Sequence, residues 1–211
     1  MKNKFDQLWI GSLFIVAFLI AIMFQQCVTL AIEKPYSDLL KKSENLFLKG
    51  NVEKALELVD EYINSHQNEK LENALALKGM YLRSLDQYRE AIIQFQKVIK
   101  INPNSVSARL YLADIYYENM EEYDLALFEI NKILELEPNN INAVVLKTYC
   151  YLSRGELKQV NDIVKKYSEI HRDNNYFKEF VVEISDIIES SYNQIGNNSP
   201  ENEVHYEFKS S

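Results

Sequence analysis

Most of this 211-residue chain consists of similar segments that repeat about every 35 residues. The clearest copy runs from Val106 to Pro138, and the copy before it ends at Pro103. A period of this length is typical of repeat architectures, in which each unit buries its apolar face only against its neighbours. The chain is therefore expected to fold as a stack of similar helical units.

In the two clearest copies, small residues alternate with bulky ones at helical spacing, and a proline follows. Small side chains let two helices cross closely, bulky ones fill the adjoining space, and a proline ends the second helix. The residues that carry this pattern are Gly79, Leu82, Ala91, Phe95, Val98 and Pro103 in one copy, and Leu112, Ala113, Tyr116, Ala126, Ile130, Ile133 and Pro138 in the next. This order resembles the tetratricopeptide repeat (TPR) family, whose unit is a pair of antiparallel helices.

The resemblance predicts a TPR solenoid over residues 36–174. Its copies cover about 36–69, 72–105, 106–140 and 141–174. The first copy has Ser43 at its first small position, and the last has Val160 where alanine is usual; end repeats are often atypical. One extra residue near Glu121 and Glu122 is expected to lengthen the turn between two helices.

After the last copy, apolar residues recur at helical spacing opposite charged ones over residues 175–193. They are Phe177, Phe180, Val181, Ile184, Ile188 and Tyr192. This pattern predicts a capping helix, and the Asn-rich and Ser-rich residues 194–211 are expected to form a disordered tail. The predicted fold class is all-α: a right-handed α-solenoid of about four TPR-like helix pairs with a C-terminal capping helix and an N-terminal transmembrane helix.

The amino-terminal end combines a short basic tail, residues 1–7, with an uncharged apolar stretch, residues 8–32. As a helix this stretch is longer than a hydrocarbon core of about 30 Å, and Trp9 suits the headgroup boundary. We expect a transmembrane signal-anchor, with a cleaved signal peptide as the alternative, since Thr29-Leu30-Ala31 offers an imperfect cleavage site. Because the tail and apolar run resemble an export signal, the repeat domain is expected outside the cytoplasm.

Composition narrows the classes of function. The net charge is −8, and basic residues are scattered among carboxylates, which argues against nucleic acid as a partner. Cys27 and Cys150 form no disulfide framework, and Cys27 lies within the apolar stretch. Cys150 is expected to be a small core residue.

The sequence shows no arrangement typical of a catalytic, cofactor or metal site. His66, His171 and His205 are far apart, the glycines are isolated, and no serine or cysteine stands in a nucleophile motif. Gly50 and Gly155 fit turns between helices. The chain is therefore expected not to be an enzyme and to need no cofactor and no metal ion.

In TPR proteins the first helix of each pair lines a concave groove, so the resemblance also predicts a partner-binding surface. Its candidate residues are Leu40, Glu44, Phe47, Ala76, Met80, Arg83, Leu110, Asp114, Tyr117, Val145, Tyr149 and Leu152. The Lys and Asn residues with which some relatives clamp a terminal carboxylate are absent from these positions. The groove is therefore expected to be apolar and to bind a protein or peptide with an apolar segment, such as an amphipathic helix.

The predicted function is that of a membrane-tethered scaffold for protein–protein interaction, with envelope assembly, secretion and protein quality control as candidate processes. Two alternatives stay open: a self-associating structural component, for which a homo-oligomer is expected, and a non-catalytic subunit of a membrane enzyme or secretion complex.

Overall fold

The computed structural model describes residues 38–65 and 71–196. These residues are helical apart from short turns, and the described part of the chain contains no β-strand. They form two compact units, described separately below: unit 1, up to Pro103, and unit 2, from Asn104. The predicted all-α, TPR-like fold is confirmed for these residues, whereas the predicted tail 1–7, apolar stretch 8–32 and tail residues 197–211 lie outside them.

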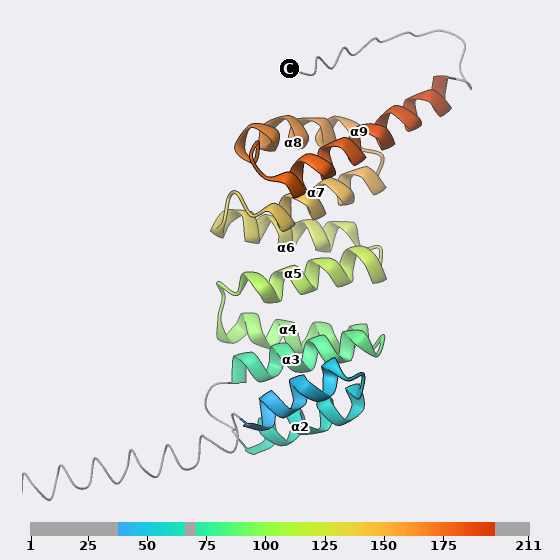
Figure 1. The fold of residues 1–211 in the computed structure, drawn as a ribbon. Helices are drawn as coiled ribbons and strands as arrows, with labels where there is room; N and C mark the ends of the chain where they lie inside the picture. The colour runs from blue at the N-terminus through green and yellow to red at the C-terminus, as the bar shows by residue number, and fades with distance from the viewer. Residues whose placement is uncertain (1–37, 66–70, 197–211) are drawn as a thin grey trace, which may run out of the picture. The chain divides into compact units, whose positions relative to one another are not determined.

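Unit 1 consists of antiparallel helices (Figure 1). Residues 38–48 are helical, and they are followed by α2 (Val52–Ser65), α3 (Leu71–Ser84) and α4 (Tyr88–Ile101). Ala55, Val59 and Tyr62 of α2 pack with Ala74 and Tyr81 of α3 in one core cluster. The alternation of small and large side chains seen in the sequence is thus the packing pattern of this core.

The crossing of α3 and α4 depends on a residue without a side chain. A Cβ atom added to Gly79 would lie 2.8 Å from the Cζ atom of Phe95, whose ring is fully buried. Ala91 of α4 is also fully buried. The small residues therefore let the two helices approach closely, as the sequence predicted.

Unit 2 continues the same pattern of helix pairs. It contains α5 (Val106–Asp114), the π-helix η1 (Ile115–Asn119), α6 (Tyr123–Leu136), α7 (Ile141–Ser153), α8 (Leu157–Ile170) and α9 (Asn175–Gly196). Each of these α-helices packs against the next one along the chain. The predicted capping segment 175–193 lies within α9, which continues to Gly196.

Local chemistry explains where the helices of unit 2 begin. The Asn140 side chain accepts a hydrogen bond of 3.0 Å from the backbone N–H of Ala143, and Asn174 accepts one of 2.9 Å from Phe177. Both asparagines satisfy backbone donors that the first turn of a helix leaves unpaired. Pro138, just after α6, cannot extend the helical hydrogen-bond ladder.

The turn inside each helix pair uses one residue with positive φ. Gly50 and Gly155 occupy it with φ of 78° and 72°, as expected for glycine. Asp86 and Glu121 occupy the equivalent places with φ of 59° and 54°. The backbone geometry of the turn is thus kept even where the residue is not glycine.

The apolar stripe of α9 covers the end of unit 2. Phe177, Phe180, Ile184 and Ile188 are buried in one core cluster with residues of α7 and α8. Phe177 also lies beside His171, with 5.1 Å between the ring centroids. This packing agrees with the capping role predicted for this helix.

Candidate binding groove

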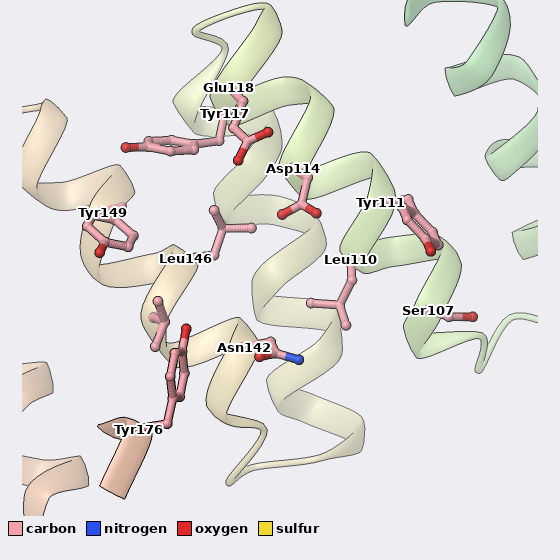
Figure 2. Close-up of a pocket in the computed structure, with 11 residues that line it drawn as sticks. Ser107, Leu110, Tyr111, Asp114, Tyr117, Glu118, Asn142, Leu146, Tyr149 and Tyr176 are labelled. Atoms are coloured by element: carbon pink, nitrogen blue, oxygen red, sulfur yellow. The ribbon is translucent and has the colours of Figure 1, made fainter. Parts of the chain in front are cut away.

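Unit 2 contains a groove between α5, η1, α7 and the first turn of α9, with a cavity volume of about 580 Å³ (Figure 2). Its volume is in the range of sites that hold small ligands or a few side chains. The groove is lined by Ser107, Leu110, Tyr111, Asp114, Tyr117, Glu118, Asn142, Val145, Leu146, Tyr149 and Tyr176. The lining therefore combines tyrosine rings and aliphatic groups with two carboxylates.

Helical periodicity explains why these residues share one surface. Leu110, Asp114 and Tyr117 are separated by four and then three positions, the spacing that places side chains on one face of a helix. On α7 the spacing from Asn142 through Val145 to Tyr149 has the same effect. The two faces meet at the groove, as Figure 2 shows.

The helix that begins with α5 ends in the five-residue π-helix η1. The backbone N–H of Met120 donates to the carbonyl of Ile115 at 3.2 Å, and that of Glu122 donates to the carbonyl of Tyr116 at 2.8 Å. The extra residue of this copy was expected in the turn, near Glu121 and Glu122. This expectation was wrong, because the wider π-turn absorbs the extra residue inside the helix.

The π-helix supplies Tyr117 and Glu118 to the groove. The ring of Tyr117 lies 6.3 Å from the ring of Tyr149, centroid to centroid, at an angle of 27° between the planes. The Tyr117 ring also lies 5.9 Å from that of Tyr123. Tyrosines from η1 and α7 thus form one aromatic wall at this end of the groove.

Tyr149 is held in place by the capping helix. Its hydroxyl donates a hydrogen bond of 3.0 Å to Glu183 of α9, and its ring meets that of Phe180 edge-on at 5.6 Å. Burial, followed by the hydrogen bond to Glu183 and its negative charge, raises the pKa of Tyr149 to about 12. Tyr149 therefore stays a neutral hydrogen-bond donor at any physiological pH.

In unit 2, five of the predicted groove residues line this cavity: Leu110, Asp114, Tyr117, Val145 and Tyr149. Leu152 does not, and it packs instead against the core cluster that contains Phe180 and Ile184. Val145 is largely buried in the same cluster. Part of the predicted surface is therefore used to hold the capping helix.

The predicted groove residues of unit 1 have a different role. Leu40, Phe47 and Met80 pack against the core cluster of this unit, and the Phe47 ring stacks on that of Tyr81 at 4.6 Å. Glu44 is exposed, while Ala76 and Arg83 are half-buried.

Several lining residues were not among the sequence candidates: Ser107, Tyr111, Glu118, Asn142, Leu146 and Tyr176. Asn142 and Tyr176 occupy the first turns of α7 and α9, and Ser107 that of α5. Ser107 and Asn142 lie one turn before the predicted candidates Leu110 and Val145, so their position was a signal present in the sequence. They add hydroxyl and amide groups, so the groove is more polar than expected.

The described residues hold no group of three or more metal-binding side chains. His171 packs between the rings of Tyr167 and Phe177. Cys150 is free and buried, and burial raises the pKa of its thiol to about 12, consistent with the predicted core position. Within residues 38–65 and 71–196, no helix is both long and apolar enough to span a bilayer.

The helix pairs, their small crossing residues and the groove on the first helices define a fold of the TPR class. The family model described as "TPR repeat" matches residues 79–119. In sequence, the chain is similar to anaphase-promoting complex subunit 7 from Dictyostelium discoideum, with 35% identity over 112 residues, which is 49% of this chain and 19% of that protein. The match thus spans about a fifth of the length of this relative.

Solved structures agree on the fold. A tetratricopeptide repeat protein from Parabacteroides merdae has a TM-score of 0.64 and 19% identity, covering 70% of this chain and 57% of that one. YrrB, described as "a TPR protein with an unusual peptide-binding site", has a TM-score of 0.58 and 16% identity, covering 72% of this chain and 74% of its own. These likenesses show a TPR-like fold, and the family match identifies a TPR repeat at residues 79–119.

Proposed function

We propose that this chain is a membrane-tethered, non-catalytic scaffold that binds a protein or peptide partner in the groove of unit 2. The observation that carries the proposal is the groove itself, in which two first helices and the start of α9 converge on about 580 Å³ of accessible space. TPR proteins mediate protein–protein interactions, and the similar structure of YrrB is described by its peptide-binding site. Tethering would place that groove beside a membrane surface.

The partner would present an apolar segment. Leu110, Val145 and Leu146 offer aliphatic surface, and the tyrosine rings extend it. Burying apolar side chains of a partner helix or extended peptide here would supply the hydrophobic part of the binding free energy. The lining of this groove contains no positively charged side chain. A partner that is held by its terminal carboxylate therefore does not fit this groove.

The groove proposal is tested with the tethered protein in its native membrane. The variant Leu110→Lys/Tyr117→Lys places two charges in the groove, and the matched control Ile93→Lys/Ile101→Lys places them on α4, where both residues are exposed. After crosslinking and pull-down, the groove variant should lose the proteins that co-purify with the wild type, while the control keeps them. Equal recovery with both variants would exclude the groove as the binding site.

The tether is proposed from residues 8–32, an uncharged stretch long enough to span a bilayer. In this proposal the repeats lie outside the cytoplasm and serve envelope assembly, secretion or protein quality control. We expect the full-length chain to resist alkaline extraction from membranes. We also expect sequencing of the mature protein to find an intact amino terminus. A mature chain that begins after Ala31 would instead establish a cleaved signal peptide.

Self-association is a second candidate, favoured by apolar side chains on α6. Leu125, Phe128 and Leu136 are 46%, 57% and 42% exposed. A second copy of the chain could cover them. Sedimentation of the full-length protein in detergent should then show a mass that rises with concentration and a loss of this behaviour in Leu125→Lys/Phe128→Lys.

The pull-down also tests a third role, that of a non-catalytic subunit of a membrane enzyme or secretion complex. In that case the recovered proteins would include the catalytic or secretory components in fixed proportion to this chain.

A further inference from the structure

The groove of unit 2 has a pronounced electrostatic character in addition to its apolar surface. Its lining includes the carboxylates of Asp114 and Glu118 and contains no Lys, Arg or His. Figure 2 shows both carboxylates on the side formed by α5 and η1, opposite Tyr149 on α7. Glu183, which accepts the hydrogen bond of Tyr149, adds a third carboxylate beside the aromatic wall.

The basic residues of α5 and α7 are directed to α6, away from the groove. Arg109 of α5 makes an ion pair with Glu129 of α6 at 2.6 Å, in which each side chain is 12% exposed. Lys147 of α7 donates to Asn131 of α6 at 2.7 Å. The negative sign of the groove therefore results from the arrangement of the helices, because their cations face α6.

The carboxylates lie beside tyrosine rings. Four tyrosines, Tyr111, Tyr117, Tyr149 and Tyr176, contribute to the lining. The face of an aromatic ring attracts a cation through its quadrupole, and nearby carboxylates add a direct charge interaction. A combination of ring faces and carboxylates is suited to a Lys or Arg side chain, whose aliphatic stem packs on the rings.

The π-helix gives this arrangement a second, independent feature. It places Tyr117 and Glu118, which are consecutive in sequence, together on the groove. Single π-turns are frequent at functional sites, which fits a binding role for this segment.

We propose that the groove of unit 2 binds a cationic segment of a partner protein, with a Lys or Arg side chain held by Asp114, Glu118 and the rings of Tyr117 and Tyr149. This inference rests on the proposed function and specifies the chemistry of the partner. Asp114 and Glu118 also have other interactions within the chain. The partner's cation would add to these interactions, so the proposal does not require either carboxylate to be unpaired.

The test compares three labelled synthetic peptides of equal length binding to the full-length chain in neutral detergent. In the first peptide Arg alternates with Leu, in the second Gln replaces every Arg, and in the third Glu does. The Arg peptide should bind at least about tenfold more tightly than the Gln peptide, a difference of about 1.4 kcal/mol, and the Glu peptide should bind most weakly. Added salt should reduce the preference.

Two variants separate the groove from the general negative charge of the protein. Asp114→Asn/Glu118→Gln removes two charges from the groove and should abolish the preference for Arg. Asp162→Asn/Glu169→Gln removes two charges from exposed positions of α8 and should leave the preference unchanged. Equal losses in both variants would overturn the proposal, because they would show nonspecific attraction.

The outcomes also distinguish this inference from the proposed function. If the Arg and Gln peptides bind equally, or if no peptide binds, the cationic partner is overturned. The proposed function would still stand if Leu110→Lys/Tyr117→Lys loses its membrane partners in the pull-down. If that variant keeps its partners, the proposed groove function fails as well.

Discussion

The close approach of α3 and α4 can be tested by giving Gly79 a side chain. In Gly79→Ala the new Cβ atom would lie 2.8, 2.9 and 3.0 Å from three ring atoms of Phe95, closer than Cβ atoms tolerate. Phe95 is fully buried, so its ring cannot swing into solvent to relieve the overlap. Either the ring or the helix must shift.

The expected change in stability is the difference between two opposing effects. Replacing glycine by alanine within a helix favours folding by about 1 kcal/mol. Overpacking of a tight core costs about 1–3 kcal/mol. Because the overlap involves three atoms of a ring that has nowhere to go, we expect the cost to prevail, with a net loss of about 1 kcal/mol in the free energy of unfolding.

Urea unfolding of the full-length chain in neutral detergent, followed by circular dichroism at the helical band, measures this change. Ala76→Gly, on the same helix, measures the helix-propensity contribution by itself. In a Phe95→Leu background the overlapping ring atoms are gone, so Gly79→Ala should become stabilising, with a coupling free energy of about 2 kcal/mol. A Gly79→Ala protein that is more stable than the wild type by the full propensity gain would refute this account of the crossing.

Three further predictions concern unit 2. Glu129→Ala should lower the free energy of unfolding by about 2 kcal/mol, because it leaves the charge of Arg109 in a mostly buried position; a change below about 0.5 kcal/mol in urea unfolding would contradict this. Tyr149→Phe should remove a phenol that ionises near pH 12 from the absorbance titration. Because the folded state keeps that proton while the unfolded state loses it near pH 10, the wild type should lose more stability than the variant as the pH rises from 10 to 12. Cys150 should resist alkylation in the folded chain and react on unfolding, as mass spectrometry of its peptide can show; rapid labelling of the folded protein would contradict its burial.

The part of the fold that sequence could predict is the part set by periodic packing. Gly79, Ala91 and Ala113 recur at positions where helices must cross, and all three are buried at such crossings. Phe177, Phe180 and Ile184 are separated by three and then four positions, which places them on one helical face and was enough to predict a capping helix. These features depend on local spacing alone, so a single sequence contains them.

The features that sequence did not predict depend on how the backbone accommodates one residue. The extra residue of the third copy could lie in a turn or in a widened helix, and its chemistry does not distinguish the two. Only the structure shows that η1 absorbs it and brings Glu118 into the groove beside Tyr117. The carboxylate of Glu118 is one source of the polar character of the groove. Asn142 and Tyr176 are two others, and they lie in first turns of helices that the family resemblance did not single out.

The central claim, that partners bind in the groove of unit 2, is tested most directly by photo-crosslinking in the native membrane. A photoreactive phenylalanine analogue is placed at Tyr117, in the groove, or at Ile93, which is 49% exposed on α4. The account predicts a discrete crosslinked partner from position 117 and none from position 93. Adducts from position 93 alone would contradict it.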